Sequence, residues 1–161
     1  MEPCPVELSS ADADQLYGSH SLDVLRGHQL ARELEELSEK MIQEVMVTFE
    51  EERVELDFSL ESLEELDTLI TQHWPEPIED EDALSAIVAN WGAYLTLLIF
   101  QNVGGQLRFR RELDHVSVYF ERLDWEVFPF HRVRLRFSGH LEHTMSDYYI
   151  ELVERLTKEA H

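Results

Sequence analysis

The sequence predicts a single α+β domain in which helices pack on one face of a small antiparallel sheet. Apolar residues recur every three or four positions through most of residues 20–103, alternate with polar residues after residue 104, and return to helical spacing near the end. Because helices and strands fall in separate blocks, the α+β class is favoured over a parallel α/β sheet. A chain of 161 residues, 43% of them hydrophobic, suits one core, so we expect residues 20–161 to fold as one domain.

A long amphipathic helix is the first element expected after a tail. Residues 1–19 are rich in Pro, Ser, Ala and Asp, and we expect a flexible tail there. From about residue 21 to 49 the apolar positions have helical spacing. Because glycine disfavours helix, we expect the stable part of this helix to start after Gly27. The apolar stripe consists of Leu22, Leu25, Leu30, Leu34, Leu37, Met41, Val45 and Phe49.

A short strand and a second helix are expected next. Residues 53–58 alternate charged and apolar side chains, which predicts a strand with one solvent-exposed face. Ser59 has a suitable hydroxyl to cap a helix that follows, and Ser62 with Glu65 forms an alternative capping box. Trp74 and the prolines after it end this helix, because proline lacks the N–H that the helical ladder needs.

An uncharged segment of 25 residues, from Ala83 to Leu107, follows a run of acids. Those acids complement the positive end of a helix dipole, so a helix is predicted to start near Asp82 and to stop at Gly104–Gly105. A membrane span needs about 20 apolar residues. Polar side chains and the glycine pair shorten the apolar stretch below that length, so a buried central helix is the favoured interpretation.

The remainder of the chain predicts a β-meander followed by a helix. Short strands are expected at residues 107–110, 115–120 and 125–128, paired antiparallel because the connections are short. Residues 130–137 alternate apolar side chains with arginines, which favours a strand, with a short helix begun at Pro129 as the close alternative. Residues 144–158 have the spacing of an amphipathic helix.

Several short sequences resemble a pattern found in small bacterial α+β proteins of unknown function. They are Leu56-Asp57-Phe58-Ser59 with Ser62-Leu63, then Gly92-Ala93-Tyr94-Leu95, Gly104-Gly105, and Phe128-Pro129-Phe130 with Val133. The resemblance covers about residues 56–154 and leaves the first helix outside. It implies a bacterial, cytoplasmic origin and carries no activity onto any residue.

The charge balance bears on the class of partner. The chain has 13 Lys and Arg against 34 Asp and Glu, a formal net charge of −21. Residues 1–103 carry 4 basic and 24 acidic residues, whereas residues 104–161 carry 9 and 10. Binding to a nucleic-acid backbone or an anionic membrane needs cations that this chain lacks, so we expect neither.

Two interpretations of the acidic helices compete. Charged faces often serve solubility alone, but a coherent acidic surface also attracts a basic protein by electrostatic steering. We therefore predict a non-enzymatic interaction protein, such as an immunity-type inhibitor or adaptor, with imitation of DNA as an extreme form. The predicted partner surface is Glu33, Glu36, Glu44, Glu50, Glu51 and Glu52.

An alternative function is a small-ligand or enzyme domain with a pocket between the central helix and the arginine-rich region. If residues 132–136 form a strand, its three arginines share one face and could hold an anion. The candidate ligand-binding residues are His131, Arg132, Arg134 and Arg136.

The sequence predicts no catalytic residue, metal or cofactor. It contains no phosphate-binding loop ending in Lys-Ser or Lys-Thr, no Gly-x-Ser-x-Gly elbow and no His-Glu-x-x-His helix. His140, His143 and Asp147 are metal-ligand types at helical spacing, but two histidines do not define a zinc site. The lone Cys4 excludes an internal disulfide, and a reducing cytoplasm is the expected compartment.

Overall fold

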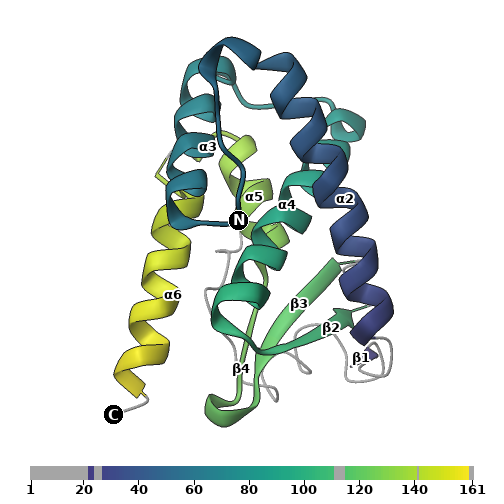
Figure 1. The fold of residues 1–161 in the computed structure, drawn as a ribbon, viewed down its shortest axis with the longest axis vertical. Helices are drawn as coiled ribbons and strands as arrows, with labels where there is room; N and C mark the ends of the chain where they lie inside the picture. The colour runs from purple at the N-terminus through teal and green to yellow at the C-terminus, as the bar shows by residue number, and fades with distance from the viewer. Residues whose placement is uncertain (1–21, 24–26, 111–114, 141, 160–161) are drawn as a thin grey trace.

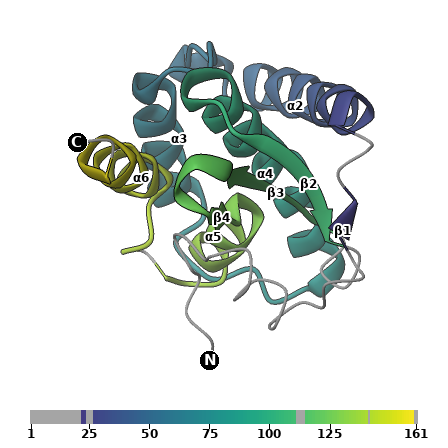
Figure 2. The same cartoon turned by 90° about the horizontal axis from the view of Figure 1, so that it is seen from below.

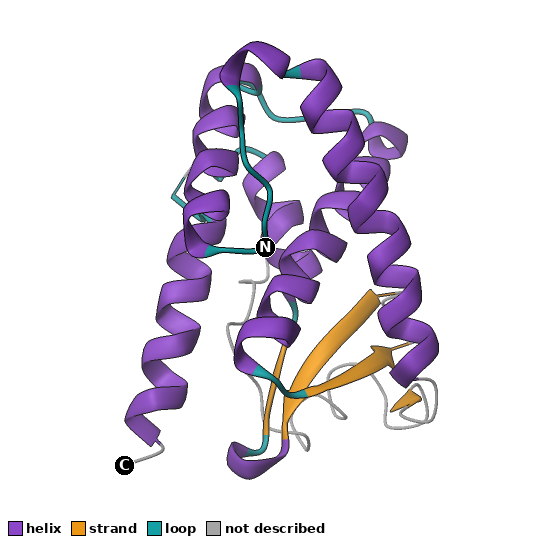
Figure 3. Ribbon diagram, in the orientation of Figure 1, coloured by secondary structure: helices purple, strands orange, loops and turns teal. Residues whose placement is uncertain are grey.

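The computed structural model describes residues 22–23, 27–110, 115–140 and 142–159, and it confirms the α+β class. Helices lie above a small sheet, as Figures 1 and 3 show. The predicted tail at residues 1–19 lies outside the described residues. In chain order the elements are β1 (Leu22–Asp23), α2 (Gly27–Thr48), the 3-10 turn η2 (Glu50–Glu52), α3 (Leu60–His73), α4 (Glu81–Val103), β2 (Gln106–Arg110), β3 (His115–Phe120), the 3-10 turn η3 (Glu121–Leu123), β4 (Trp125–Val127), α5 (Pro129–Phe137) and α6 (Met145–Glu159).

The sheet has the order β1-β2-β3-β4, and every neighbouring pair is antiparallel. Its pleat separates two kinds of side chain. Leu107, Val116, Val118 and Val127 belong to the apolar core under the helices. Because successive residues of a strand point to opposite faces, Arg108, Ser117 and Glu126 lie on the other side of the sheet. The short connections predicted the meander of β2, β3 and β4, whose bounds lie within two residues of the expected positions.

The first helix begins at Gly27, next to the firm start predicted just after this glycine, rather than at the first apolar residues of the stripe. Leu22, placed by its apolar spacing in the helical stripe, instead pairs with Arg110 as part of β1, and α2 starts at Gly27. A two-residue strand has no periodicity of its own, so only its pairing partner on β2 reveals it. Leu25 lies outside the described residues, while Leu30, Leu34, Met41 and Val45 are buried in the core as predicted.

α4 is the central helix of the fold. Asp80 caps its N-terminus, with Oδ2 accepting the Ala83 N–H at 3.2 Å, and Gly104 ends it at a φ of +94° that favours glycine. Every residue from Trp91 to Ile99 is buried, because α2, α5, β3 and α6 all pack on this helix. Figure 2 shows α2 and α6 on opposite sides of it.

By length and composition α4 is also the one helix in the described ranges that could cross a membrane. The same helix is the core of this domain, and 61% of its most apolar 18-residue window is buried inside the protein. Packing within the domain therefore accounts for the uncharged sequence.

Gly92 allows α5 to approach α4 closely. A Cβ at this position would lie 2.3 Å from Cδ1 of Phe130, far inside van der Waals contact. The missing side chain thus lets the Phe130 ring pack directly on the α4 backbone. This contact fixes the ring position in the pocket described below.

The strand predicted for residues 53–58 is wrong, although its burial alternation is present. Val54, Leu56 and Phe58 are half-buried, and the charged residues between them are exposed. Side chains rather than a neighbouring strand satisfy the backbone of this segment. The Glu65 carboxylate accepts the Glu55 N–H at 3.0 Å, and the Tyr94 hydroxyl accepts the Phe58 N–H at 2.9 Å. Glu65 therefore does not complete the alternative capping box, and Ser59 Oγ caps α3 by accepting the Ser62 N–H.

The strand favoured for residues 130–137 is also wrong, and the helix alternative is right. Pro129 occupies the first turn of α5, where its missing N–H costs no hydrogen bond. Phe130, Val133 and Phe137 recur at helical spacing and enter the core. The alternation with arginines misled the prediction because Arg132 and Arg136, four residues apart, fill a second buried face of the same helix.

Asp67 on α3 caps α6 from across the domain. Its carboxylate accepts the Met145 N–H at 2.9 Å, the Ser146 N–H at 2.9 Å and the Ser146 hydroxyl at 2.6 Å. These bonds satisfy N–H groups that the first turn of a helix leaves without intrahelical partners. The cap therefore joins α6 to α3.

We predict that Asp67→Ala lowers the free energy of unfolding by about 3 kcal/mol, because buried N–H donors lose a charged acceptor. Urea denaturation followed by circular dichroism measures the change. Glu61→Ala, at an exposed position of the same helix, is the control and should cost less than about 0.5 kcal/mol. Equal losses in the two variants would contradict the assigned role of Asp67.

Candidate functional site

The predicted acidic surface lies on α2 and η2. With 3.6 residues per turn, Glu33, Glu36 and Glu44 fall within about 80° of one another around the helix. All three are exposed, and η2 continues the acidic sequence directly after the helix. We call the six residues Glu33, Glu36, Glu44, Glu50, Glu51 and Glu52 the acidic ridge.

Most of the ridge carboxylates have no cationic partner within the described chain. Glu36, Glu44, Glu50 and Glu51 form no ion pair there, and Glu52 contacts His73 Nε2 at 2.9 Å. No basic residue occupies the last turn of α2. The acids of η2 therefore follow the negative end of the helix dipole, which is an unfavourable place for them.

Three arginines from the C-terminal half of the chain contact groups outside the acidic ridge. Arg108 pairs with Glu126 at 3.2 Å, and Arg134 pairs with Glu81 at the start of α4. Arg136 is buried and donates from Nη2 to Thr71 Oγ1 at 3.0 Å. Burial lowers the pKa of Arg136, while the carboxylates of Asp67 and Glu142 oppose that shift.

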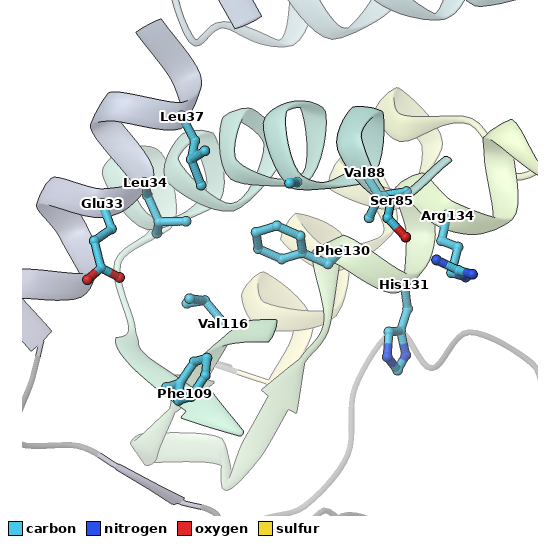
Figure 4. A pocket seen from close by; sticks show the side chains of 11 residues that line it. Glu33, Leu34, Leu37, Ser85, Val88, Phe109, Val116, Phe130, His131 and Arg134 are labelled. Atoms are coloured by element: carbon cyan, nitrogen blue, oxygen red, sulfur yellow. The ribbon is translucent and has the colours of Figure 1, made fainter. Parts of the chain in front are cut away.

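A cavity of about 620 Å³, which we call the central pocket, opens between α2, α4, α5 and the β2–β3 pair. This is the place where the sequence suggested a ligand site. Figure 4 shows the Phe130 ring in the middle, with Glu33 on one side and the polar groups of α4 and α5 on the other. Its lining residues are Glu33, Leu34, Leu37, Ser85, Val88, Ala89, Phe109, Val116, Phe130, His131 and Arg134.

Only two of the four predicted ligand-binding residues line this pocket. His131 and Arg134 do, and the His131 ring stacks near Phe128 with 5.7 Å between centroids. Arg132 instead donates to the Thr144 carbonyl at 3.2 Å and to His143 Nδ1 at 3.0 Å. Arg136 faces α3, as its bond to Thr71 shows. The expectation that the arginines share one face is wrong because α5 is a helix.

A second cavity, of about 320 Å³, lies beside the C-terminal half of α2, and we call it the aromatic pocket. Trp74 contacts both Phe49 and Trp91 edge-on, at centroid distances of 5.7 Å. Glu44 of the acidic ridge lines the pocket, and Val47, 76% exposed, lies on the same helix three residues away. The full lining is Lys40, Glu44, Val45, Thr48, Phe49, Trp74, Ala83, Ala86, Ile87, Asn90 and Trp91.

The histidines predicted as metal-ligand types do lie together, but with Glu142 rather than Asp147. Ligand atoms of His140, Glu142 and His143 lie within 4.8 Å of one another. Arg132, which is always a donor, contacts His143 Nδ1, so the neutral ring carries its proton on Nε2, the atom 3.6 Å from Glu142. A metal-bound histidine needs an acceptor on its second nitrogen, and here that nitrogen faces a guanidinium. The arrangement therefore does not favour metal binding.

A polar network on the outer side of the sheet is absent from the sequence predictions. The Glu126 side chain is fully buried, accepts the Ser117 hydroxyl at 2.7 Å and pairs with Arg108. The Arg108 guanidinium also lies 3.6 Å from the centroid of the Tyr119 ring. Alternation within each strand could have placed these residues on one face, but strand register was needed to bring them together.

The acidic ridge, the central pocket and the aromatic pocket are the candidate binding features of the described residues. Comparisons of the chain with protein-family models, with curated proteins and with solved structures find no match. The resemblance to small bacterial α+β proteins stays a prediction. Function is therefore inferred from the chemistry of these three features.

The environment of His143 makes a prediction about pH. Burial and then the positive charge of Arg132 lower the pKa of His143 below 6.5, with a smaller contribution of the same sign from His140, while Glu142 opposes the shift. The folded protein thus binds this proton more weakly than the unfolded chain does. The contribution of His143 to stability is present above the ordinary pKa of 6.5 and is lost as the pH falls through the lower pKa of the folded protein.

We expect Arg132→Gln to raise the His143 titration midpoint measured by NMR, because a positive neighbour is removed. Arg155→Gln, which removes a positive charge from α6, is the control and should leave the midpoint unchanged. An unchanged midpoint in Arg132→Gln, or a midpoint above 6.5 in the parent protein, would contradict this description.

Proposed function

We propose that the protein acts by binding a basic partner protein through the acidic ridge, rather than by catalysis. The observation that carries the proposal is that four of the ridge carboxylates are exposed and make no ion pair within the described chain. An inhibitor or adaptor of a cationic protein would use such a surface for fast, steered association. Arg108, Arg134 and Arg136 contact groups outside the ridge and do not neutralise it.

Local electrostatics support a binding role over a stabilising one. Acids beyond the C-terminus of a helix oppose its dipole, at a cost of about 0.3–1 kcal/mol for each charge at low salt. Solubility needs negative charge but does not require it at this unfavourable end of α2. A cationic partner would relieve both the repulsion among these carboxylates and their unfavourable interaction with the dipole.

The aromatic pocket would add a contact of another kind. Interfaces combine a charged rim with a few apolar or aromatic side chains that fill pockets and carry much of the binding energy. Val47 is 76% exposed, and together with the pocket it places apolar surface beside Glu44. The proposed partner segment therefore carries lysines or arginines around one bulky apolar side chain.

We predict that the triple variant Glu44→Gln, Glu50→Gln, Glu51→Gln weakens binding of a lysine-rich peptide carrying one phenylalanine by about tenfold. Isothermal titration at low salt measures the affinity, and added salt should weaken the parent complex because exposed charges are screened. The matched control replaces Glu61, Glu64 and Glu154 by Gln. If the two triple variants lose affinity equally, the peptide responds to net charge alone and the ridge is not the binding surface.

A separate prediction concerns the aromatic pocket. Ala86 is exposed and lines it, so Ala86→Phe should fill the pocket without disturbing the core. We expect this variant to remove the preference for the phenylalanine peptide over its alanine counterpart, a difference of about tenfold in the parent protein. Emission from Trp74 and Trp91 reports on the peptide, which contains no tryptophan. Equal affinity of the two peptides for the parent protein would exclude the pocket as an anchor and leave the ridge proposal standing.

A further inference from the structure

We infer that the aromatic pocket selects a phenol ring, the side chain of tyrosine, through a hydrogen bond between the phenol hydroxyl and the Asn90 amide. The ring would come from the basic partner, so its source rests on the proposed function. The anchor that fills the pocket is then an aromatic ring with a polar tip instead of a purely apolar side chain.

The exposure of its lining residues gives the aromatic pocket an entrance and a floor. Glu44 and Ala86 are exposed and lie at the entrance, whereas Val45, Asn90 and Trp91 are 3%, 9% and 4% exposed and form the floor. Ligand pockets commonly have volumes of about 300–1,000 Å³. At about 320 Å³ this cavity lies at the lower end of that range, so it suits one inserted ring better than a larger molecule.

The aromatic walls of the pocket are fixed before any ligand binds. Trp74 packs edge-on against Trp91 with 5.7 Å between ring centroids, and against Phe137 with 5.4 Å. The rings of Trp91 and Phe137 are also edge-on to each other, at 5.2 Å, so the three rings hold one another in place. Aromatic rings gain energy from edge-on or offset contacts with a further ring, so these walls favour an aromatic ligand over an aliphatic one.

Asn90 is the polar residue on the floor. Its side-chain amide makes no hydrogen bond within the residues that the structure describes. The amide has two N–H donors and a carbonyl acceptor, and leaving them buried without a partner costs stability. A leucine of similar size would avoid that cost. The amide at this position therefore points to a ligand that forms a hydrogen bond with it.

The floor and the walls together select the class of ligand. A phenol hydroxyl both donates and accepts, so it can bond with either group of the Asn90 amide. A phenylalanine ring would fill the same space and leave the amide without a partner. A carboxylate would meet Glu44 at the entrance, and a lysine would have to exchange the water around its ammonium for one neutral acceptor. A neutral aromatic ring with one hydroxyl is the best match.

The test uses three lysine-rich peptides that differ only in one central residue, which is tyrosine, phenylalanine or alanine. Isothermal titration at low salt measures the affinities. We expect the tyrosine peptide to bind the parent protein about tenfold more tightly than the phenylalanine peptide, because the second peptide leaves the amide unpaired. In NMR spectra, the side-chain NH₂ signals of Asn90 should shift more with the tyrosine peptide than with the phenylalanine peptide.

Two variants locate the hydrogen bond. Asn90→Leu should abolish the preference for tyrosine and keep the preference for phenylalanine over alanine. Thr48→Val, which removes a hydroxyl from the exposed part of the same lining, is the matched control and should keep the tenfold preference. Thermal unfolding should show Asn90→Leu to be at least as stable as the parent protein. A clear loss of stability would mean that the amide is bonded inside the fold, and it would overturn the inference.

A pair of uncharged probes separates this inference from the proposed function. p-Cresol and toluene have the same ring with and without the hydroxyl, and neither needs the acidic ridge; NMR titration measures their affinities. If p-cresol binds more tightly, Asn90→Leu removes the difference and no peptide binds, the phenol site is supported and the basic partner is contradicted.

Three results would overturn the inference. They are equal affinity of the parent protein for p-cresol and toluene or for the tyrosine and phenylalanine peptides, a tyrosine preference that survives in Asn90→Leu, and one that Thr48→Val removes. Each of these results leaves the proposed binding through the ridge standing, because that experiment alters Glu44, Glu50 and Glu51 and keeps Asn90.

Discussion

Burial of α4 on nearly all sides is the constraint on which the rest of the structure depends. A helix without charge from Ala83 to Val103 must be covered, and α2, α5, α6 and the sheet surround it. Gly92 brings α5 close enough to place Phe130, and the strands follow at once from the turn at Gly104. Both pockets form where side chains of α2 and α4 leave space between the two helices.

The fold also places the arginines of the C-terminal half away from the carboxylates of α2 and η2. Three buried arginines lie beside other groups: Arg108 beside Glu126 on the outer side of the sheet, Arg132 beside His143, and Arg136 beside Thr71. On the exposed side of α2 and η2, Glu36, Glu44, Glu50 and Glu51 form no ion pair within the residues that the structure describes. Three of the ridge acids, in η2, follow the C-terminus of α2, where they oppose the helix dipole. The proposed binding of a cationic partner would stabilise these carboxylates, which the fold itself does not pair.

Sequence reasoning succeeded where one strong local signal determined the structure. The uncharged run with acids before it and glycines after it defined α4, and Ser59 defined the start of α3. It failed where a local pattern suited two structures. The alternation at residues 53–58 reflects burial without a strand partner, because Glu65 and Tyr94 satisfy the backbone instead. The alternation after Pro129 concealed a helix with two buried faces.

The site residues were also predictable only where a local signal determined them. Exposure of the ridge could be read from helical phase, whereas pairing of Arg134 with Glu81, distant in sequence, required the tertiary structure.

The most direct test of this account is the stability of the variant in which Glu44, Glu50 and Glu51 are all replaced by Gln, measured by urea unfolding at low salt. If the ridge serves binding at the expense of the fold, the variant is as stable as the parent protein or more stable, by up to about 2 kcal/mol, and the difference shrinks as salt is added. A loss of more than about 1 kcal/mol would mean that these carboxylates hold the fold together, and the central claim would be wrong.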